Sequence, residues 1–139
     1  MEWRKGDFRI TDDPRAVDVD FVERMLRISY WAPERPRETI EHTLGTSIPL
    51  SLLRDDVQIG FARVVSDEMT FAWICDLIID PAHRGDGLGK WFMECIMEHP
   101  AVAGTSQQLL RTSDAHGLYA KYGFEISECM TRRSKPSRI

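Results

Sequence analysis

The chain has 139 residues, 42% of them hydrophobic and 29% charged, which is the balance of a soluble globular protein with one domain over residues 1–139. No apolar run reaches the roughly 18 residues of a membrane helix, and the first residues lack an export signal, so we expect a cytoplasmic protein without membrane contact. The formal net charge is −4, but residues 132–139 hold four basic side chains and no acidic one, which leaves −8 (14 basic against 22 acidic residues) on the rest. An acidic body argues against a nucleic-acid partner and favours a cationic amine, and the basic tail is expected to be frayed.

The N-terminal part is predicted to contain a strand, two helices and a loop. A short strand over residues 8–11 precedes Asp12-Asp13-Pro14, a typical helix-start signal. Apolar residues at helical spacing then predict a helix that ends near residue 29. Two prolines break any helix in the segment 30–36, which is therefore expected to be a loop, and a second helix is predicted over residues 37–44.

The rest of the chain is predicted to alternate between strands and helices. Three strands with intervening turns form an antiparallel meander, and the hydrophobic period changes to a helical one after them. The predicted elements are strands at 50–54, 58–65 and 70–79, a helix at 89–98, a strand at 108–111, a helix at 114–122 and a strand at 124–130. The order β-α-α-β-β-β-α-β-α-β predicts an α/β domain with a mixed, mostly antiparallel central sheet flanked by helices.

Cysteine and histidine residues give no metal site. The cysteines Cys75, Cys95 and Cys129 are widely spaced and form no Cys-x-x-Cys pair, and none of the four histidines lies at metal-ligand spacing from another histidine or a cysteine. We therefore expect no metal, and we expect the two cysteines in apolar runs to be buried thiols.

A glycine-rich loop between the strand at 70–79 and the helix at 89–98 is the segment most informative about function. It reads Arg84-Gly85-Asp86-Gly87-Leu88-Gly89-Lys90. Glycines let backbone N–H groups turn toward an anion, and a helix start adds free N–H groups and the positive end of its dipole, so a phosphate or pyrophosphate fits here. The spacing matches neither a Walker A loop nor a dinucleotide fingerprint, and a connector without ligand is the alternative.

Two segments carry a resemblance to a known family. The loop Arg84-Gly85-Asp86-Gly87-Leu88-Gly89 resembles the (Q/R)-x-x-G-x-(G/A) motif of the GNAT superfamily of acyl-CoA-dependent N-acyltransferases. A second segment is similar to that family's A-x-x-(L/F)-Y-x-x-x-G-F block: Ala115-His116-Gly117-Leu118-Tyr119-Ala120-Lys121-Tyr122-Gly123-Phe124. The order of predicted elements also resembles the family's order over nearly the whole chain.

The resemblance implies a donor site and a general acid. Acetyl-CoA would lie in the gap between the strand ending at Ile79 and the strand near 108–111. Its contacts would be the backbone of Leu77, Ile78 and Ile79 for the pantetheine arm and of Arg84, Gly85, Asp86, Gly87, Leu88, Gly89 and Lys90 for the pyrophosphate. Tyr119 would protonate the leaving thiolate, with core packing as the alternative. Thr112 stands where the family often has Asn, so it and Asp114 are weaker candidates for contacting the cofactor.

Asp76 is the candidate general base, because it interrupts an apolar strand near that gap. On strict alternation it shares a face with Ala72, Ile74 and Ile78, where burial would raise its pKa. The alternative is a structural aspartate that holds backbone groups or a nearby arginine.

Tyr30, Trp31 and Trp73 are candidates for lining the acceptor pocket, since aromatic faces hold ammonium groups. Simple packing is the alternative for each of them.

These features predict an acetyl-CoA-dependent N-acetyltransferase. A primary amine of a small molecule would attack the thioester directly in a ternary complex, without a cysteine acyl-enzyme. Compact members of the family commonly dimerise, so the resemblance also implies a homodimer. Two alternatives stay open: a non-catalytic acyl-CoA-binding or sensor domain, and an acetylase of protein amines.

Overall fold

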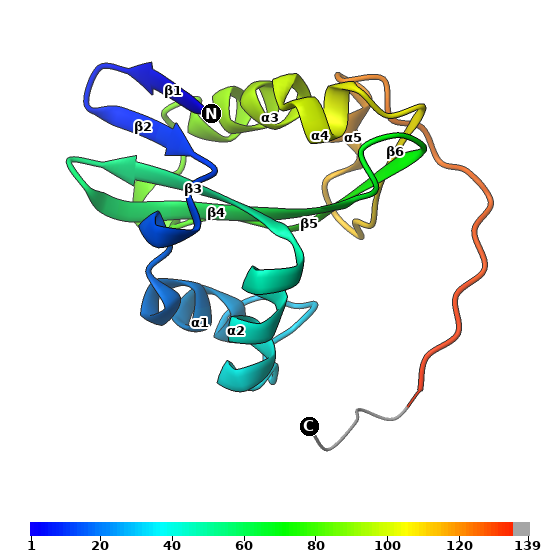
Figure 1. Cartoon of the computed structure of the whole chain (residues 1–139), viewed down its shortest axis with the longest axis horizontal. Coiled ribbons are helices and arrows are strands. Elements are labelled where there is room, and N and C mark those ends of the chain that lie inside the picture. Colours follow the sequence, from blue (N-terminus) through cyan, green and yellow to red (C-terminus); the bar gives the residue numbers. More distant parts are fainter. Residues whose placement is uncertain (135–139) are drawn as a thin grey trace.

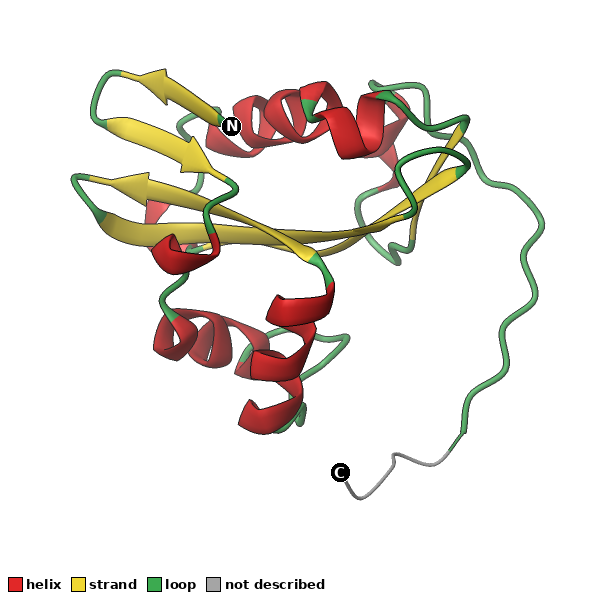
Figure 2. Cartoon of the chain, viewed as in Figure 1, coloured by secondary structure: helices red, strands yellow, loops and turns green. Residues whose placement is uncertain are grey.

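The computed structural model describes residues 1–134 and forms a sheet with helices on both faces (Figure 1, Figure 2). The strands are β1 (Glu2–Lys5), β2 (Phe8–Thr11), β3 (Ile48–Arg54), β4 (Val57–Ser66), β5 (Phe71–Ile79) and β6 (Gln107–Leu110). The helices are α1 (Val19–Arg27), α2 (Arg37–Thr46), α3 (Leu88–Glu98), α4 (Pro100–Ala103) and α5 (His116–Ala120). Helices α1 and α2 lie below the sheet in Figure 1, and α3 and α4 lie above it. No described helix is long and apolar enough to cross a bilayer.

The six strands lie in chain order from β1 to β6. Every neighbouring pair is antiparallel except β5 and β6, which are parallel. The parallel pairing runs only from Phe71 opposite Gln107 to Ile74 opposite Leu110. Residues 75–79 of β5 therefore continue past the end of β6, and no strand among the described residues pairs with them on that side.

Two hydrophobic cores, one on each face of the sheet, hold the helices. Helix α3 buries Leu88, Phe92, Met93, Cys95 and Ile96, a helical stripe that packs on the inner strands. On the other face, α1 buries Phe21, Val22, Met25 and Leu26 against Phe61 and Ile78. Helix α1 begins where the Asp18 carboxylate accepts the N–H of Phe21, as expected of an N-cap aspartate.

A β-bulge at Asp76 changes which face of the sheet the end of β5 presents. Phe61 pairs with Ile78 and Arg63 pairs with Cys75, so β5 has one residue more than β4 in this interval. Asp76 takes a positive φ of 53°. As a result Ile74 packs in the core under α3, whereas Ile78 packs in the core against α1 and α2. The expectation that Asp76 shares one face with Ala72, Ile74 and Ile78 was wrong, because an inserted residue reverses the alternation.

The α/β class and the mixed sheet are as predicted, but both ends of the chain differ. An additional strand, β1, forms a hairpin with β2 that the polar sequence of residues 2–5 did not indicate. The predicted strand at 124–130 does not form: Phe124 packs against the core, but Ile126 and Met130 are 86% and 99% exposed and cover no apolar surface. Helix α5 is also shorter than the predicted 114–122, and α4 adds a turn after His99.

The basic tail falls partly within the described residues. Arg132 and Arg133 are exposed and lie outside any helix or strand. Lys135 and Arg138 lie outside the described residues.

A pair of glycines gives a test of the packing between β3, β4 and β5. A Cβ added to Gly60 would lie 3.0 Å from the Cβ of Leu52 and 3.2 Å from the carbonyl oxygen of Ile78. We expect Gly60→Ala to lower the free energy of unfolding by about 1–3 kcal/mol, because neither neighbour can move freely. Gly45 lies in α2 with nothing within 4 Å, so Gly45→Ala is expected to raise it by about 0.5–1 kcal/mol. Urea unfolding of both variants checks this, and equal effects would contradict it.

Candidate active site

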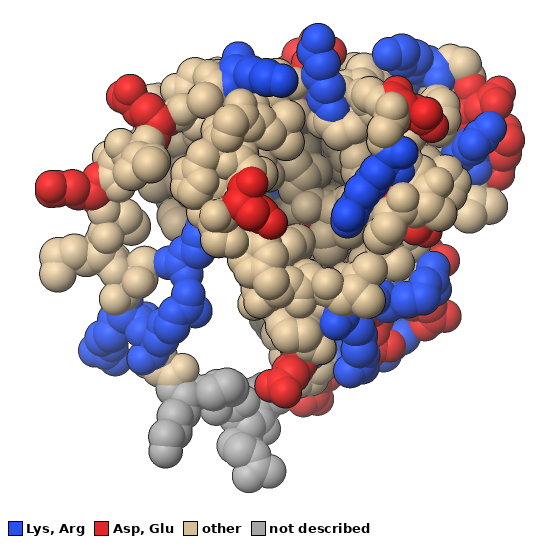
Figure 3. Space-filling model, turned by 180° about the vertical axis from the view of Figure 1, so that it is seen from behind, with Lys and Arg blue, Asp and Glu red and all other residues tan. Residues whose placement is uncertain are grey.

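The separation of β5 from β6 opens a gap at the edge of the sheet. Beyond Ile74 the two strands are no longer paired, and the chain leaves β5 for the glycine-rich loop and leaves β6 for α5. Seen from behind, the molecule is hollowed near its centre, with acidic and basic side chains interspersed around the hollow (Figure 3). The backbone edge at residues 75–79 can therefore accept an extended, amide-containing chain.

The glycine-rich loop presents backbone N–H groups at the end of this gap. Gly85 and Gly87 have positive φ values of 99° and 73°, and Gly87 precedes α3. No side chain caps the start of α3, so the N–H groups of its first turn remain available to an anion. Arg84 donates from Nε to the carbonyl oxygen of Ile79 at 3.1 Å, which joins the loop to the end of β5. The loop therefore fits a diphosphate.

Tyr119 lies on α5, half-buried against the core under α3. Its ring meets that of Phe124 edge-on, with 6.2 Å between centroids. Burial raises the pKa of the Tyr119 phenol, and the nearby Tyr30 and Asp114 act in the same direction. The phenol is therefore protonated at neutral pH and can serve as a proton donor.

Thr112 uses its hydroxyl within the turn before α5. The oxygen accepts the N–H of Ala115 at 3.0 Å and that of Asp114 at 3.3 Å. These bonds satisfy two donors near the start of a short helix, so the side chain has a local structural role. Contacts of Thr112 and Asp114 with a cofactor stay predictions.

Asp76 is the centre of a buried polar cluster. Its carboxylate accepts from Nη1 of Arg35 and Nε of Arg63, both at 2.7 Å, and from the indole N–H of Trp31 at 2.9 Å. The Asp76 side chain is only 4% exposed. Burial alone would raise its pKa, but the charges of Arg35 and Arg63 and the hydrogen bonds to it outweigh burial, so the pKa of Asp76 lies below its usual value.

The loop between α1 and α2 spans the gap through Tyr30 and Trp31. The Tyr30 hydroxyl accepts the N–H of Ser113 at 3.0 Å, which joins this loop to the segment between β6 and α5. The rings of Tyr30 and Trp31 meet edge-on at 5.1 Å, and Trp31 donates to Asp76 on β5. Trp73 is half-buried opposite Val65, on the same face as the Asp76 cluster. The structure thus brings the three predicted acceptor-side aromatics to one face.

Arg35 and Arg63 are site residues that the sequence analysis did not select. Arg63 has a visible signal, because a single arginine interrupts the apolar strand β4, as Asp76 interrupts β5. Two opposite charges in neighbouring apolar strands indicate a buried ion pair. Arg35 lies in the proline-bounded loop, where the sequence gives no indication of its partner.

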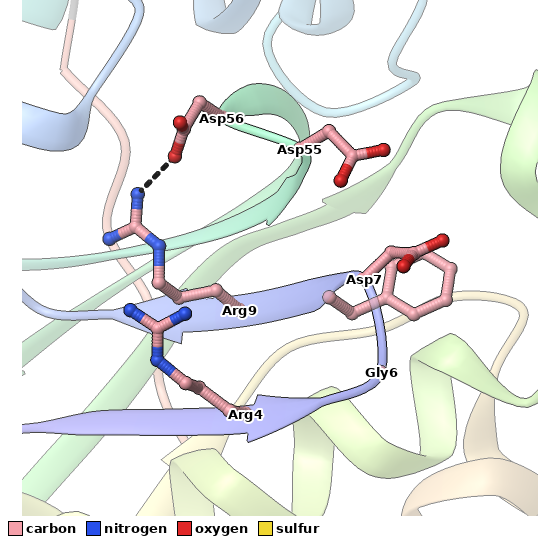
Figure 4. A pocket seen from close by; sticks show the side chains of 7 residues that line it. Arg4, Gly6, Asp7, Arg9, Asp55 and Asp56 are labelled. Carbon is pink, nitrogen blue, oxygen red and sulfur yellow. Dashed lines mark hydrogen bonds and ion pairs between the residues drawn. The ribbon is translucent and has the colours of Figure 1, made fainter.

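Two shallow hollows lie away from this gap. One, of about 240 Å³, lies between the β1–β2 and β3–β4 turns, where Arg9 pairs with Asp56 (Figure 4). The other, of about 220 Å³, lies beside β6 and is lined by Gln107, Gln108, Tyr122, Gly123, Phe124, Glu125 and Ser127. Neither includes the glycine-rich loop or Asp76.

Cys75 and Cys95 offer no reactive thiolate, and the residue types that bind metals form no cluster among the described residues. Burial raises the pKa of Cys75 and, further, that of Cys95 to about 12, so both thiols are protonated at neutral pH. Within residues 1–134, no three side chains of His, Cys, Asp or Glu are grouped so as to hold a metal ion.

Comparisons with known proteins agree with this geometry. The family model described as an acetyltransferase (GNAT) domain matches residues 50–126. A Gibberella zeae protein named an acetyltransferase is 27% identical over 144 residues, covering 87% of this chain and 80% of that protein. A Prochlorococcus marinus protein named an N-acetyltransferase is 32% identical over 101 residues, covering 69% of this chain and 56% of that protein.

A solved structure is similar over nearly the whole fold. The crystal structure of a Xanthomonas campestris protein assigned to the GNAT family has a TM-score of 0.87 at 35% identity, covering 91% of this chain and 93% of that one. The chain therefore belongs to the GNAT family of acetyltransferases and is an acyltransferase. The usual cosubstrate of this family is acetyl-CoA, which the glycine-rich loop and the open edge of β5 fit.

Substituting Asp76 distinguishes a structural aspartate from a catalytic base. Asp76→Asn leaves two guanidinium groups without their shared charge, so we expect the free energy of unfolding at pH 7 to fall by about 3 kcal/mol. Folding lowers the pKa of Asp76, so its contribution is complete above the unfolded value near ~4 and is lost as the pH falls through the folded value. The wild type and variant should therefore converge in acid.

Urea unfolding at several pH values measures this difference. Asp56→Asn is the control, because the Asp56 side chain is 88% exposed and its pairing with Arg9 is expected to contribute about 1 kcal/mol at most. Undiminished stability of Asp76→Asn, together with turnover lost chiefly at neutral pH, would favour the base instead.

Proposed function

We propose that the protein transfers an acetyl group from acetyl-CoA to a primary amine of a small molecule, by direct attack in a ternary complex. The observation that supports it most is the gap between β5 and β6, with a glycine-rich helix start at one end and a half-buried tyrosine on α5. The amine would approach from the face that carries Trp31, Trp73 and the Asp76 cluster.

On the donor side, the backbone does most of the binding. The N–H groups of residues 84–90 would hold the pyrophosphate, with Arg84 and Lys90 adding positive charge. The edge of Leu77, Ile78 and Ile79 would pair with the pantetheine amides as a neighbouring strand does. This pairing would fix the thioester next to the bulge at Asp76.

On the leaving-group side, we assign Tyr119 as the general acid. The free-base amine nitrogen forms a bond to the acetyl carbon, the carbon–sulfur bond breaks, and the thiolate takes the phenolic proton. The proton released from the nitrogen passes to water, and the phenolate of Tyr119 regains a proton from water. Protonation at neutral pH supports this role, since burial raises the pKa of Tyr119. The raised pKa values of Cys75 and Cys95 favour direct attack over a cysteine acyl-enzyme.

Asp76 is better suited to positioning than to proton abstraction. A carboxylate with a lowered pKa that already accepts three hydrogen bonds is a weak base. We therefore propose that it holds the Trp31 loop against β5. The homodimer and the cytoplasmic location stay predictions, and acetylation assays with protein amines test the alternative acceptor.

The glycine-rich loop is tested with two matched glycines. Gly87 and Gly6 both have a positive φ, 73° and 59°, and nothing within 4 Å of an added Cβ. Alanine costs about 1–2 kcal/mol of backbone strain at either position. Only Gly87→Ala should weaken CoA binding, with Kd raised about tenfold in calorimetry, whereas Gly6→Ala should leave Kd within about twofold. No association of the wild type with CoA would refute the donor site.

Tyr119→Phe tests the general acid. Removing the phenolic proton should lower kcat by about a hundredfold, while the Kd for CoA stays within about twofold, since the ring still packs on Phe124. Tyr122→Phe is the control, because the Tyr122 hydroxyl donates to the carbonyl of Lys90 and has no part in the proposed chemistry. Unchanged turnover of Tyr119→Phe would remove the proposed role, and no turnover in any protein would favour a sensor domain.

A further inference from the structure

The polar cluster at the bulge carries an excess of positive charge. Arg35 and Arg63 are ionised at neutral pH, and Asp76 is the single carboxylate between them. Within residues 1–134, the ion pairs of both arginines are with Asp76 alone. The cluster therefore has a net charge of +1, in a body whose overall charge is negative.

The side chains that carry the excess charge have little contact with bulk water. The side chains of Arg35 and Arg63 are 22% and 14% exposed. Arg63 donates from Nε to Asp76 and from Nη1 to the Ser47 hydroxyl, the latter at 3.1 Å. Arg35 makes one side-chain hydrogen bond within the described chain, through Nη1 to Asp76, although a guanidinium has five N–H donors. Arg35 thus keeps donors for a further anionic partner.

The position of Arg35 connects it to the acceptor side. Arg35 donates to Asp76, the residue that precedes the proposed pantetheine edge at Leu77, and Trp31 donates to the same carboxylate. Trp31 is 42% exposed, so the loop offers an accessible aromatic face beside the guanidinium. The charges of both arginines act on the pKa of Cys75, so the excess positive charge lies along the end of β5.

We propose that the acceptor is a primary amine that also carries an anionic group, a carboxylate or a phosphate, and that Arg35 binds this group. The inference rests on the proposed acetyl transfer and names its substrate class. Guanidinium groups bind both anions in a bidentate manner, which fixes the orientation of the molecule as well as its position. The anionic end would pair with Arg35 beside Trp31, and the amine would point toward the thioester at the bulge.

Net charge alone favours a cationic amine, and the charge of the cluster adds an anionic group to the acceptor. The acidic body attracts a cationic amine over long range, but long-range charge governs encounter more than recognition. At short range, the extra positive charge of the cluster favours an anion, because an uncharged acceptor would leave one guanidinium without a counter-charge. Both features suit a zwitterionic molecule.

The test compares acceptors that share an amine and differ in the second group. An α-amino acid, its carboxamide, an aminoalkyl phosphate and the matching alkylamine are assayed at several pH values, with kcat/KM expressed per free-base amine. We expect the carboxylate or the phosphate acceptor to exceed its uncharged counterpart by about tenfold to a hundredfold. The stronger of the two identifies the anion.

Variants of Arg35 connect this preference to the guanidinium. Arg35→Gln should lower kcat/KM for the charged acceptors about tenfold more than for the uncharged amine, and Arg35→Lys should restore part of that preference. The matched control is Arg37→Gln, because Arg37 is an exposed arginine whose ion pairs are with Asp20, Glu23 and Glu41. It should leave the preference intact.

Three outcomes would overturn the proposal or its basis. Equal rates for charged and uncharged acceptors in the wild type would overturn it, even if Arg35→Gln fails to fold. An equal loss for every acceptor in Arg35→Gln would show a structural role only. No turnover with any amine, despite CoA binding, would contradict the proposed function itself and remove this inference with it.

Discussion

The arrangement of the site depends on the buried carboxylate of Asp76. An extra residue in β5 with a positive φ would be costly in an apolar strand unless something held it there. Three donors do so: Arg63 from β4, and Arg35 and Trp31 from the loop between α1 and α2. The same interaction therefore decides which face of the sheet the last residues of β5 point to. It also holds the loop between α1 and α2 on the sheet.

The proposed donor and acceptor sites differ in the parts of the polypeptide that form them. The proposed donor side relies on backbone: the unpaired edge of β5, glycines with positive φ, and a helix start without a side-chain cap. Such a site tolerates changes in most side chains, because the groups that bind are common to all residues. The proposed acceptor side would rely on particular side chains, Trp31 and Arg35 among them, so related proteins could differ in substrate there.

The sequence predicted the central strands and α3 well, whereas the roles of the donor-side and acceptor-side residues stay predictions. Hydrophobic periods located these elements, and glycine spacing located the loop with positive φ values before α3, because both depend on local chain geometry. The partners of Asp76 could not be predicted, since Arg35 lies 41 positions away and meets it only through the fold. The bulge was missed for a related reason: alternation assumes an uninterrupted strand. The predicted strand at 124–130 failed because a period of two forms a strand only where a neighbour is available to pair with it.

The hydrogen bond from the Ser113 N–H to the Tyr30 hydroxyl connects two segments that flank the same gap. One flank follows β6 and leads to Tyr119, and the other is anchored to β5 through Trp31. A molecule that spreads these strands must stretch this bond, and one that draws the flanks together must shorten it. If ligands on the two flanks both moved these segments, their binding would be linked, and such linkage is reciprocal, so each ligand would change the affinity for its counterpart by the same factor.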